Sequence, residues 1–350
     1  MPVSLTAQEA EGFESGRLAP AYLDLLGAAG FRACAAASRL GVFAALADGP
    51  ATAAEVAERA GIDATMTGLL LRMLTAYGYL EVDGDRVALT EASRVHLVPG
   101  PRSYTAVLEF WDRLLGDLWP SLEQSVRSGR PAEDFYGWLE DHPTERETFQ
   151  AMLAGLAGRL SGELRERVPL PPGGLVLDVA GGHGRYAVEY LTADPEARAL
   201  IVDLPGALDI ARTTCEGAGV GGRCTYAAWD LRSGDPLPAA GADVALLYNV
   251  VHGFTAETNM LLLLRVAEAL APGGLVGVLE QLGAAVTERT PCNEAFVQMF
   301  SLNLAHGQSG RSYTLDDITG WLAEAGFADV ADSALDASAT DHLITAHRPG

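Results

Sequence analysis

The feature that most constrains the fold of this chain is the alternation of short apolar runs with helical segments over residues 174–283. GLVLDVA, ARALIVDLP, CTYAAWDL, ADVALLYNVVH and LVGVLEQLG are mostly apolar, as strands buried on both faces should be. RYAVEYLTAD, GALDIARTTCEGAG and TAETNMLLLLRVAEALAPGG lie between them and are typical of helices. The tail beyond Leu315 adds one helix and two strands. This pattern predicts an α/β fold with a mostly parallel, Rossmann-like sheet.

The N-terminal part has a different pattern, which predicts helix, turn, helix and hairpin. Thr52 and Glu55 have the spacing of a capping box at the start of TAAEVAERA. Asp63 can cap the next helix, TMTGLLLRMLTAYG. A turn at Asp83 and Gly84 then joins two short strands. Together these signals predict a winged helix-turn-helix unit.

A winged unit can bind DNA, but the charge of this chain argues against that function. The formal net charge is −22, and residues 51–100 carry more acidic than basic side chains. A phosphate backbone therefore has little to bind, and we expect no nucleic-acid partner. The segment at 17–47 is too apolar to leave in water, which favours a homodimer built by the N-terminal helices. A winged-helix regulator that senses a ligand is the less favoured alternative.

Composition excludes several other classes of protein. All 24 basic residues are arginine, so a Schiff-base lysine and a P-loop lysine are both absent. The four cysteines are scattered and no HExxH occurs, so we expect neither a disulfide framework nor a metal site. No run of 18 apolar residues and no secretory signal is found, which predicts a cytoplasmic protein without a membrane partner.

Residues that can carry chemistry follow the ends of successive predicted strands. The first strand runs into a glycine turn at 181–184, where a ligand can approach the backbone at a helix N-terminus. Asp203, after the second strand, can accept hydrogen bonds from both hydroxyls of a ribose. Asp230 follows the third strand and can accept from an adenine amino group, while His252 and Glu280 lie near the ends of the next two. These positions predict a nucleotide site at the switch point of the sheet.

The motifs LDVAGGHG, IVDLPGAL, WDL, LLYNVVHGFTAETN, LAPGGLVGVLE and RSYTLDDITGWLAEAGF follow one another in this order. Together they resemble the class I S-adenosylmethionine-dependent small-molecule O-methyltransferases of the plant caffeate and bacterial polyketide type. The resemblance covers nearly the whole chain, because that family also has a helical, winged-helix N-terminal half that swaps into a dimer. It implies S-adenosylmethionine as cofactor and a small, flat, phenolic secondary metabolite as acceptor.

The resemblance also implies site residues. Glycines would approach the methionine part of the cofactor, two carboxylates and the leucines after them would hold its ribose and adenine, and a methionine would lie near the sulfonium. These cofactor-binding residues are Gly181, Gly182, Gly184, Asp203, Leu204, Asp230, Leu231 and Met152. The residues predicted to bind the acceptor are Trp111, Met299, Asn303 and His306.

His252 matches the histidine that deprotonates the acceptor in this family, and Glu280 matches an acid that orients it. A phenol with a pKa of about 10 is mostly protonated at pH 7, and a neutral imidazole can take its proton as the oxygen attacks the methyl group. The chain has Gly253 and Ser312 where the plant enzymes usually have acids. This difference leaves N-, C- or S-methylation open, and also hydroxylation, decarboxylation or pericyclic chemistry on the same scaffold.

These expectations divide the chain into three parts. Residues 1–100 form a helical, winged-helix dimerisation domain, and residues 101–168 form a helical linker that contributes to the acceptor pocket. Residues 169–350 form the Rossmann-like, S-adenosylmethionine-binding catalytic domain. Within the linker, we expect helices at 103–129 and 143–168 with an aromatic loop between them.

Overall fold

The computed structural model describes residues 5–100, 102–233, 235–284 and 289–350. The chain divides into two compact units, one up to Asp117 and one from Leu118 onward. The linker predicted at 101–168 is therefore split between the two units, and its predicted start at residue 101 lies outside the described residues. The division into three parts remains a prediction.

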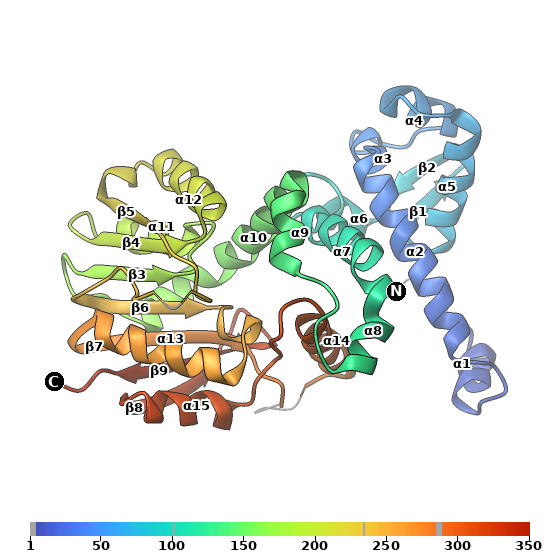
Figure 1. Cartoon of the computed structure of the whole chain (residues 1–350). Helices are drawn as coiled ribbons and strands as arrows, with labels where there is room; N and C mark the ends of the chain where they lie inside the picture. Colours follow the sequence, from blue (N-terminus) through green and yellow to red (C-terminus); the bar gives the residue numbers. More distant parts are fainter. Residues whose placement is uncertain (1–4, 101, 234, 285–288) are drawn as a thin grey trace. The chain divides into compact units, whose positions relative to one another are not determined.

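The N-terminal unit is helical, with one small hairpin (Figure 1). Its elements are α1 (Ala7–Glu14), α2 (Ala21–Arg39), α3 (Val42–Ala45), α4 (Ala53–Ala60), α5 (Ala64–Ala76), β1 (Leu80–Asp83), β2 (Arg86–Leu89), α6 (Glu91–His96) and α7 (Thr105–Asp117). Cys34, Phe43, Leu46, Leu71 and Leu74 are fully buried and form the centre of its core. The helices and hairpin that the sequence predicts for the winged unit are all present.

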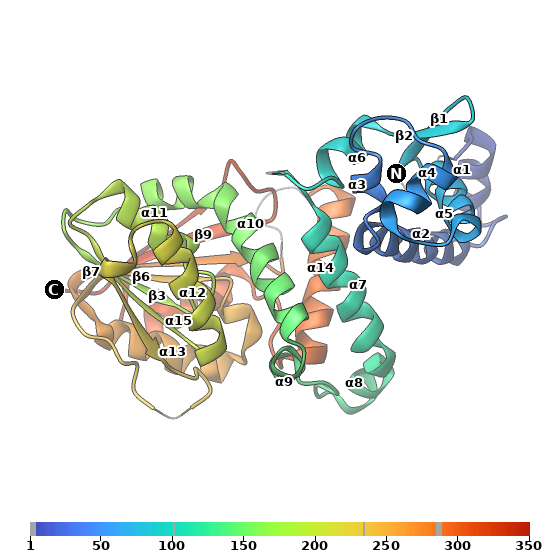
Figure 2. The same ribbon diagram turned by 90° about the horizontal axis from the view of Figure 1, so that it is seen from above.

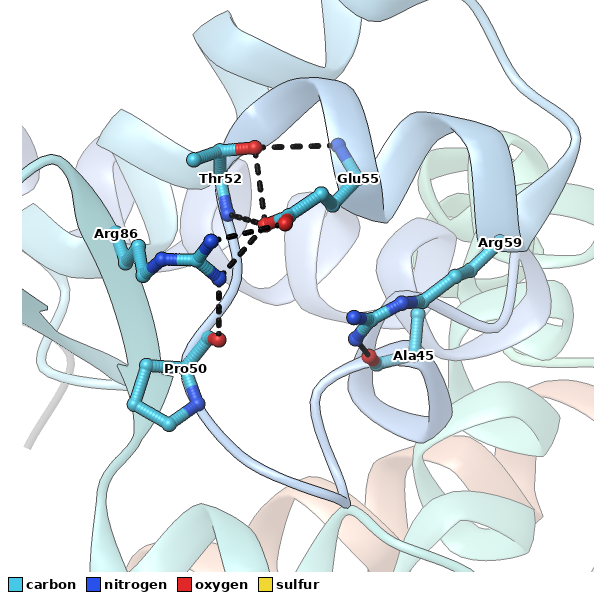
Figure 3. Close-up of polar contacts among 6 residues, drawn as sticks. All are labelled: Ala45, Pro50, Thr52, Glu55, Arg59 and Arg86. Carbon is cyan, nitrogen blue, oxygen red and sulfur yellow. Dashed lines mark hydrogen bonds and ion pairs between the residues drawn. The ribbon is translucent and has the colours of Figure 1, made fainter.

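The predicted capping box at the start of α4 also connects this helix to β2 of the hairpin. Thr52 Oγ1 accepts the backbone N–H of Glu55 at 3.3 Å, and Glu55 Oε2 accepts the backbone N–H of Thr52 at 2.7 Å. Arg86 of β2 donates to both carboxylate oxygens of Glu55, at 2.8 and 2.9 Å (Figure 3). The hydrogen bond from the Thr52 backbone, followed by that from Arg86, lowers the pKa of Glu55 to about 2. The carboxylate is therefore ionised, and the link is intact, throughout the neutral pH range.

A seven-stranded sheet forms the centre of the C-terminal unit. Its strands are β3 (Leu175–Val179), β4 (Arg198–Asp203), β5 (Cys224–Ala228), β6 (Ala242–Tyr248), β7 (Leu270–Gln281), β8 (Ala328–Ala334) and β9 (Asp341–His347). They lie in the order β5-β4-β3-β6-β7-β9-β8. Neighbours from β5 to β7 are parallel, and β9 is antiparallel to both β7 and β8.

Helices cover both faces of this sheet (Figures 1 and 2). The helices of the unit are α8 (Leu122–Ser128), α9 (Phe135–Asp141), α10 (Pro143–Arg167), α11 (Arg185–Ala193), α12 (Pro205–Gly217), α13 (Ala256–Ala269), α14 (Pro291–Gly307) and α15 (Leu315–Glu324). Leu164 and Leu191 of α10 and α11 are buried on one face, and Leu263 and Leu322 of α13 and α15 on the other. Burial on both faces explains the continuous apolar runs of the strands and confirms the predicted fold class.

Two predicted boundaries beside the site are wrong. The strand predicted to reach His252 ends at Tyr248, because Asn249 adopts a left-handed conformation with φ of 58°. A 3₁₀ turn at Val251–Gly253 follows, so His252 lies beyond the strand. The helix predicted at 255–274 ends at Ala269, and the chain continues directly into β7.

Two further corrections concern the segment before the sheet. The predicted aromatic loop at 129–143 contains α9, whose start is capped by Asp134: its side chain accepts the N–H of Gly137 at 3.1 Å. The single helix predicted at 103–129 is interrupted by a 3₁₀ turn at Trp119–Ser121, which includes a proline that lacks the N–H an α-helix requires.

We predict that Ala180→Gly stabilises the protein. Ala180 follows β3 with φ of 55°, a conformation that disfavours an alanine by about 1–2 kcal/mol. The greater freedom of glycine in the unfolded chain offsets about 0.4–1 kcal/mol of that gain. Urea unfolding followed by circular dichroism should therefore show a net gain of up to about 1.6 kcal/mol. Ala187→Gly, inside α11, is the control and should destabilise; a loss of stability in Ala180→Gly would contradict the argument.

Candidate active site

The predicted glycine turn, Asp203, His252 and Glu280 lie where β3, β4, β6 and β7 end. β3 lies between β4 and β6, so the connections after β3 and β6 leave toward opposite faces of the sheet. This is the switch point at which open α/β sheets bind ligands. The glycine turn follows β3, Asp203 ends β4, and the turn that carries His252 follows β6.

The glycine turn is held by the carboxylate of Asp203. Its Oδ2 accepts the N–H of Gly182 at 2.8 Å, and its Oδ1 accepts the N–H of Leu204 at 2.6 Å. Each oxygen keeps a further lone pair, which is the geometry needed to accept two ribose hydroxyls. A Cβ on Gly182 would lie only 3.1 Å from Oδ2, so glycine keeps this approach open.

A second carboxylate, which we did not predict, lies behind the turn. Asp178 of β3 is buried, and a Cβ on Gly181 would lie 2.5 Å from its Cγ. Its Oδ2 has no hydrogen-bond partner among the described residues. Burial raises the pKa of Asp178 to about 7 and that of Asp203 to about 6. Two buried acids with raised pKa values favour a cation at this turn, and a sulfonium nucleotide fits that requirement.

The other residues of the turn pack against the protein. Gly184 has φ of 68° and begins α11, and a Cβ there would lie 3.2 Å from Cys215 Sγ. His183 is buried, accepts the N–H of Arg185 at 3.1 Å through Nδ1, and has its pKa lowered to about 4, chiefly by burial. His183 is therefore neutral at physiological pH.

The predicted adenine-binding residues lie on two different segments. Leu204 is the residue before α12 and is half-buried, while Leu231 packs against the core of the sheet. Asp230 is paired with Arg232, whose guanidinium donates to both carboxylate oxygens at 3.1 Å. A hydrogen bond from an adenine amino group would have to use the remaining lone pairs of that carboxylate.

Tyr136 of α9 lies beside the turn that carries His252, and the sequence did not single it out. A Cβ on Gly253 would lie 3.6 Å from the Tyr136 hydroxyl. The pKa of Tyr136 is raised, first by burial and then by the charge of Asp203, with smaller contributions of the same sign from Asp230 and Glu280 and an opposite one from Arg232. Tyr136 lies in the aromatic segment DFYGW, but nothing in the sequence distinguishes it from the core aromatics beside it.

The predicted catalytic pair is in direct contact. His252 Nδ1 lies 2.6 Å from Glu280 Oε2, and Glu280 Oε1 accepts the N–H groups of Val250 and His252 at 2.9 and 3.3 Å. Glu280 is only 2% exposed, whereas the His252 side chain is 13% exposed. An ionised carboxylate can only accept, so this contact favours the proton on Nδ1; in the neutral imidazole Nε2 is then the unprotonated nitrogen. This is the state that a general base requires.

The turn that carries His252 is held from two sides. Asn259 of α13 is fully buried and donates from Nδ2 to the carbonyl of Val251 at 2.8 Å. Tyr313 donates from its hydroxyl to the carbonyl of Phe254 at 2.6 Å. Neither residue was predicted from the sequence.

The structure gives a steric reason for Gly253. A Cβ at this position would lie 2.9 Å from Gln308 Oε1 and 3.6 Å from the Tyr136 hydroxyl, so a larger residue here would require the Gln308 side chain to move. Ser312, the other departure from the plant pattern, is buried, and its hydroxyl has no partner in the part of the chain that the structure describes.

The predicted acceptor-binding residues are in different environments. On α14, Met299 is half-buried and Asn303 accepts the indole N–H of Trp119 at 2.9 Å. His306 is buried, with Nδ1 2.7 Å from the Ser125 hydroxyl and Nε2 3.0 Å from the carbonyl of Leu118, so both ring nitrogens are engaged by the protein. Phe300, which we did not select, packs edge-on against the His252 ring at 5.2 Å.

The two remaining predicted residues lie on long helices. Trp111 belongs to α7 of the N-terminal unit, and Met152 is buried in α10. Their roles stay predictions.

Two absences concern the described residues only. They contain no group of three or more His, Cys, Asp or Glu side chains that could hold a metal ion. None of their helices is long and apolar enough to cross a membrane.

A parallel sheet with a glycine turn, a carboxylate after β4 and a histidine after β6 defines a Rossmann-like methyltransferase. The chain belongs to the O-methyltransferase family. The model of the O-methyltransferase domain matches residues 119–328, and that of the O-methyltransferase dimerisation domain matches residues 25–99. The predicted family, enzyme class and dimerisation domain are thereby confirmed.

Individual relatives agree with this assignment. The chain is 30% identical to 3-hydroxy-5-methyl-1-naphthoate 3-O-methyltransferase of Streptomyces sahachiroi, over 84% of this chain and 85% of the relative. It is 28% identical to the N,N-dimethyltransferase OxyT of Streptomyces rimosus, over 91% and 93%. The structure of human N-acetylserotonin methyltransferase in complex with SAM shares 26% identity and a TM-score of 0.79, over 95% and 99%. With the family match, that complex confirms the predicted cofactor, S-adenosylmethionine.

We expect cofactor affinity to depend on the charge of Asp203. The pKa of its carboxyl is raised to about 6 by burial, so lowering the pH from 8 to 5 protonates it and weakens its acceptance of ribose hydroxyls. Calorimetry with S-adenosylhomocysteine should show roughly a tenfold loss of affinity over this range. In Asp203→Asn the affinity should be lower at pH 8 and the pH dependence should be reduced to the part that Asp178 contributes, since the pKa of Asp178 is also raised, to about 7. An Asp203→Asn protein that binds like the wild type would refute the ribose assignment.

Proposed function

We propose that this protein transfers the methyl group of S-adenosylmethionine to a hydroxyl of a small, flat, phenolic secondary metabolite, with His252 as the general base. The observation that carries this proposal is the 2.6 Å contact between His252 Nδ1 and Glu280 Oε2. It fixes the tautomer in which Nε2 can accept a proton, and an acceptor hydroxyl needs that step at neutral pH.

The cofactor supplies an electrophilic methyl group on a positively charged sulfur. Asp203 and the turn around Gly182 would hold the nucleotide. The carboxylates of Asp178 and Asp203, when ionised, would attract the positively charged sulfonium. His252 Nε2 takes the acceptor proton as the oxygen attacks, and Glu280 stabilises the imidazolium that results. Holding the acceptor oxygen in line with the methyl carbon supplies a large part of the rate by itself.

Aromatic rings beside His252 favour a flat acceptor. Phe300 packs against the histidine ring, and Phe296 stacks on Phe300 with centroids 6.0 Å apart. Both rings come from α14, as do the predicted acceptor residues Met299 and Asn303. Aromatic walls with few polar groups suit planar, largely apolar ligands. The naphthoate that one relative is named for belongs to this class.

N-methylation is the second candidate, because OxyT is named as an N,N-dimethyltransferase. The His252–Glu280 pair favours a hydroxyl, since a neutral amine attacks a methyl group without prior loss of a proton. Incubation with S-adenosylmethionine and matched phenols and arylamines, followed by mass spectrometry, distinguishes the two. Gain of one methyl group on a phenol supports the proposal. Gain on arylamines alone overturns it, and so does turnover without S-adenosylhomocysteine, which would indicate a non-methylating enzyme.

His252→Ala should lose roughly 10²–10⁴-fold in turnover of a phenol at pH 7. The loss should shrink as the pH approaches the phenol pKa of about 10, because an ionised acceptor needs no base. Glu280→Gln should lose less, since it only orients and polarises the ring. Initial rates from pH 6 to 10 test both, with S-adenosylhomocysteine affinity as the control for an intact cofactor site. Wild-type turnover in His252→Ala at pH 7 would remove His252 as the base.

We also propose that the chain forms a homodimer through its N-terminal unit. That unit contains the family's dimerisation domain, and Tyr22 and Leu25 of α2 are 55% and 63% exposed. Light scattering at micromolar concentration should give twice the mass of one chain. A Tyr22→Glu/Leu25→Glu double variant should shift the equilibrium toward the monomer, because it places charges on an apolar surface. A monomeric wild-type protein would contradict this.

A further inference from the structure

One buried polar group near the glycine turn, the side-chain amide of Gln150, has an oxygen without a hydrogen-bond partner among the described residues. Gln150 lies on α10, two residues before the predicted Met152, and is 9% exposed. Its side-chain oxygen Oε1 is buried and makes no hydrogen bond to any described residue. A buried amide without a partner destabilises the ligand-free protein, and such groups are rare in folded chains.

The Gln150 amide lies beside the glycine turn and the Asp203 carboxylate. A Cβ built on Gly182 would lie 3.0 Å from both Nε2 and Oε1 of Gln150, and 3.1 Å from Asp203 Oδ2. The Gln150 amide therefore lies across the backbone of the glycine turn, on the same side as the Asp203 carboxylate. The two groups are within about 6 Å of each other, so one ligand in the crevice can reach both.

The chemistry of an amide selects one part of the cofactor. Asp203 offers only acceptors, which match two ribose hydroxyls. The amino-acid end of S-adenosylmethionine carries an ammonium, which donates, and a carboxylate, which accepts. A glutamine amide supplies one acceptor and two donors in a single planar group. It can therefore pair with either charge, or with both, without adding a net charge beside Asp178 and Asp203.

From this geometry we infer that the Gln150 amide binds the amino-acid end of S-adenosylmethionine. Gln150 is thus a cofactor-binding residue that pairs with the part of the ligand that Asp203 does not hold. The inference rests on the proposed function only in that the cofactor binds at the glycine turn. In the ligand-free protein the buried Oε1 of Gln150 lacks a hydrogen bond, which destabilises the fold, and the bound ligand would supply that hydrogen bond.

Two ligands that differ only in this end test the inference. S-adenosylhomocysteine has the complete amino-acid end, whereas 5′-methylthioadenosine keeps adenine, ribose and the thioether but lacks the ammonium and carboxylate. Calorimetry on Gln150→Leu should show S-adenosylhomocysteine weakened by about tenfold or more, as expected for lost hydrogen bonds to charged groups. The affinity for 5′-methylthioadenosine should stay within about twofold of the wild type, since leucine removes no contact to that ligand.

The thermal midpoint of the ligand-free protein separates binding from packing. Because leucine removes an unpaired polar group, ligand-free Gln150→Leu should unfold at the wild-type temperature or above it. Gln124→Leu makes the same substitution at an exposed position of α8 and is the control; both of its affinities should be unchanged.

Three results would overturn the inference. An equal loss of affinity for both ligands would indicate that the amide contacts the ribose or the adenine instead. Unchanged affinities with a lowered thermal midpoint would make Gln150 a packing residue. A wild-type protein that binds neither ligand would reject the cofactor site itself, and that result is distinguishable because it appears before any substitution is made.

Discussion

The arrangement of the candidate site depends on the hydrogen bonds that the buried carboxylate of Glu280 accepts. A buried charge is stable only when its lone pairs are satisfied, and Glu280 meets this need with the N–H groups of Val250 and His252 and the Nδ1 of the His252 ring. One side chain of β7 thus fixes the turn after β6, the orientation of the imidazole and its tautomer. The base role that we propose for His252 depends on this contact as much as on the histidine itself.

The cofactor side of the crevice follows a complementary principle. Asp178 and Asp203 are buried with raised pKa values, and Gln150 keeps an unpaired amide oxygen beside them. Ala180 holds a left-handed conformation at the same turn. The two buried acids and the unpaired amide oxygen disfavour the empty site, and a bound cationic nucleotide with a charged amino-acid end would offset that cost. Strain and incomplete pairing of this kind are typical of binding sites.

Family membership and local geometry together explain the departures from the plant pattern. Gly253 has Gln308 and Tyr136 where an acidic side chain would have to lie. An acid after the histidine would displace the Gln308 side chain, and the contact between His252 and Glu280 forms without it. The bacterial relatives include enzymes named for hydroxyl and for amine acceptors. The base role proposed for His252 is thus the point at which the two chemistries can be separated in this chain.

The sequence by itself determined the elements whose signals are local: the capping box of Thr52 and Glu55, and the strands with continuous apolar runs. The order of its motifs also places Asp203 and Glu280 in the last residues of β4 and β7 and His252 in the turn after β6. Only the tertiary structure decided which buried groups meet across the chain. Tyr136 and Gln150 belong to helices before the sheet and lie close to Gly253 and Gly182, which are far away in the sequence. His306 forms hydrogen bonds with Ser125 and Leu118, which the sequence did not predict. The physical reason is that periodicity and caps act within a few residues, whereas burial and pairing of polar groups depend on neighbours that folding alone brings together.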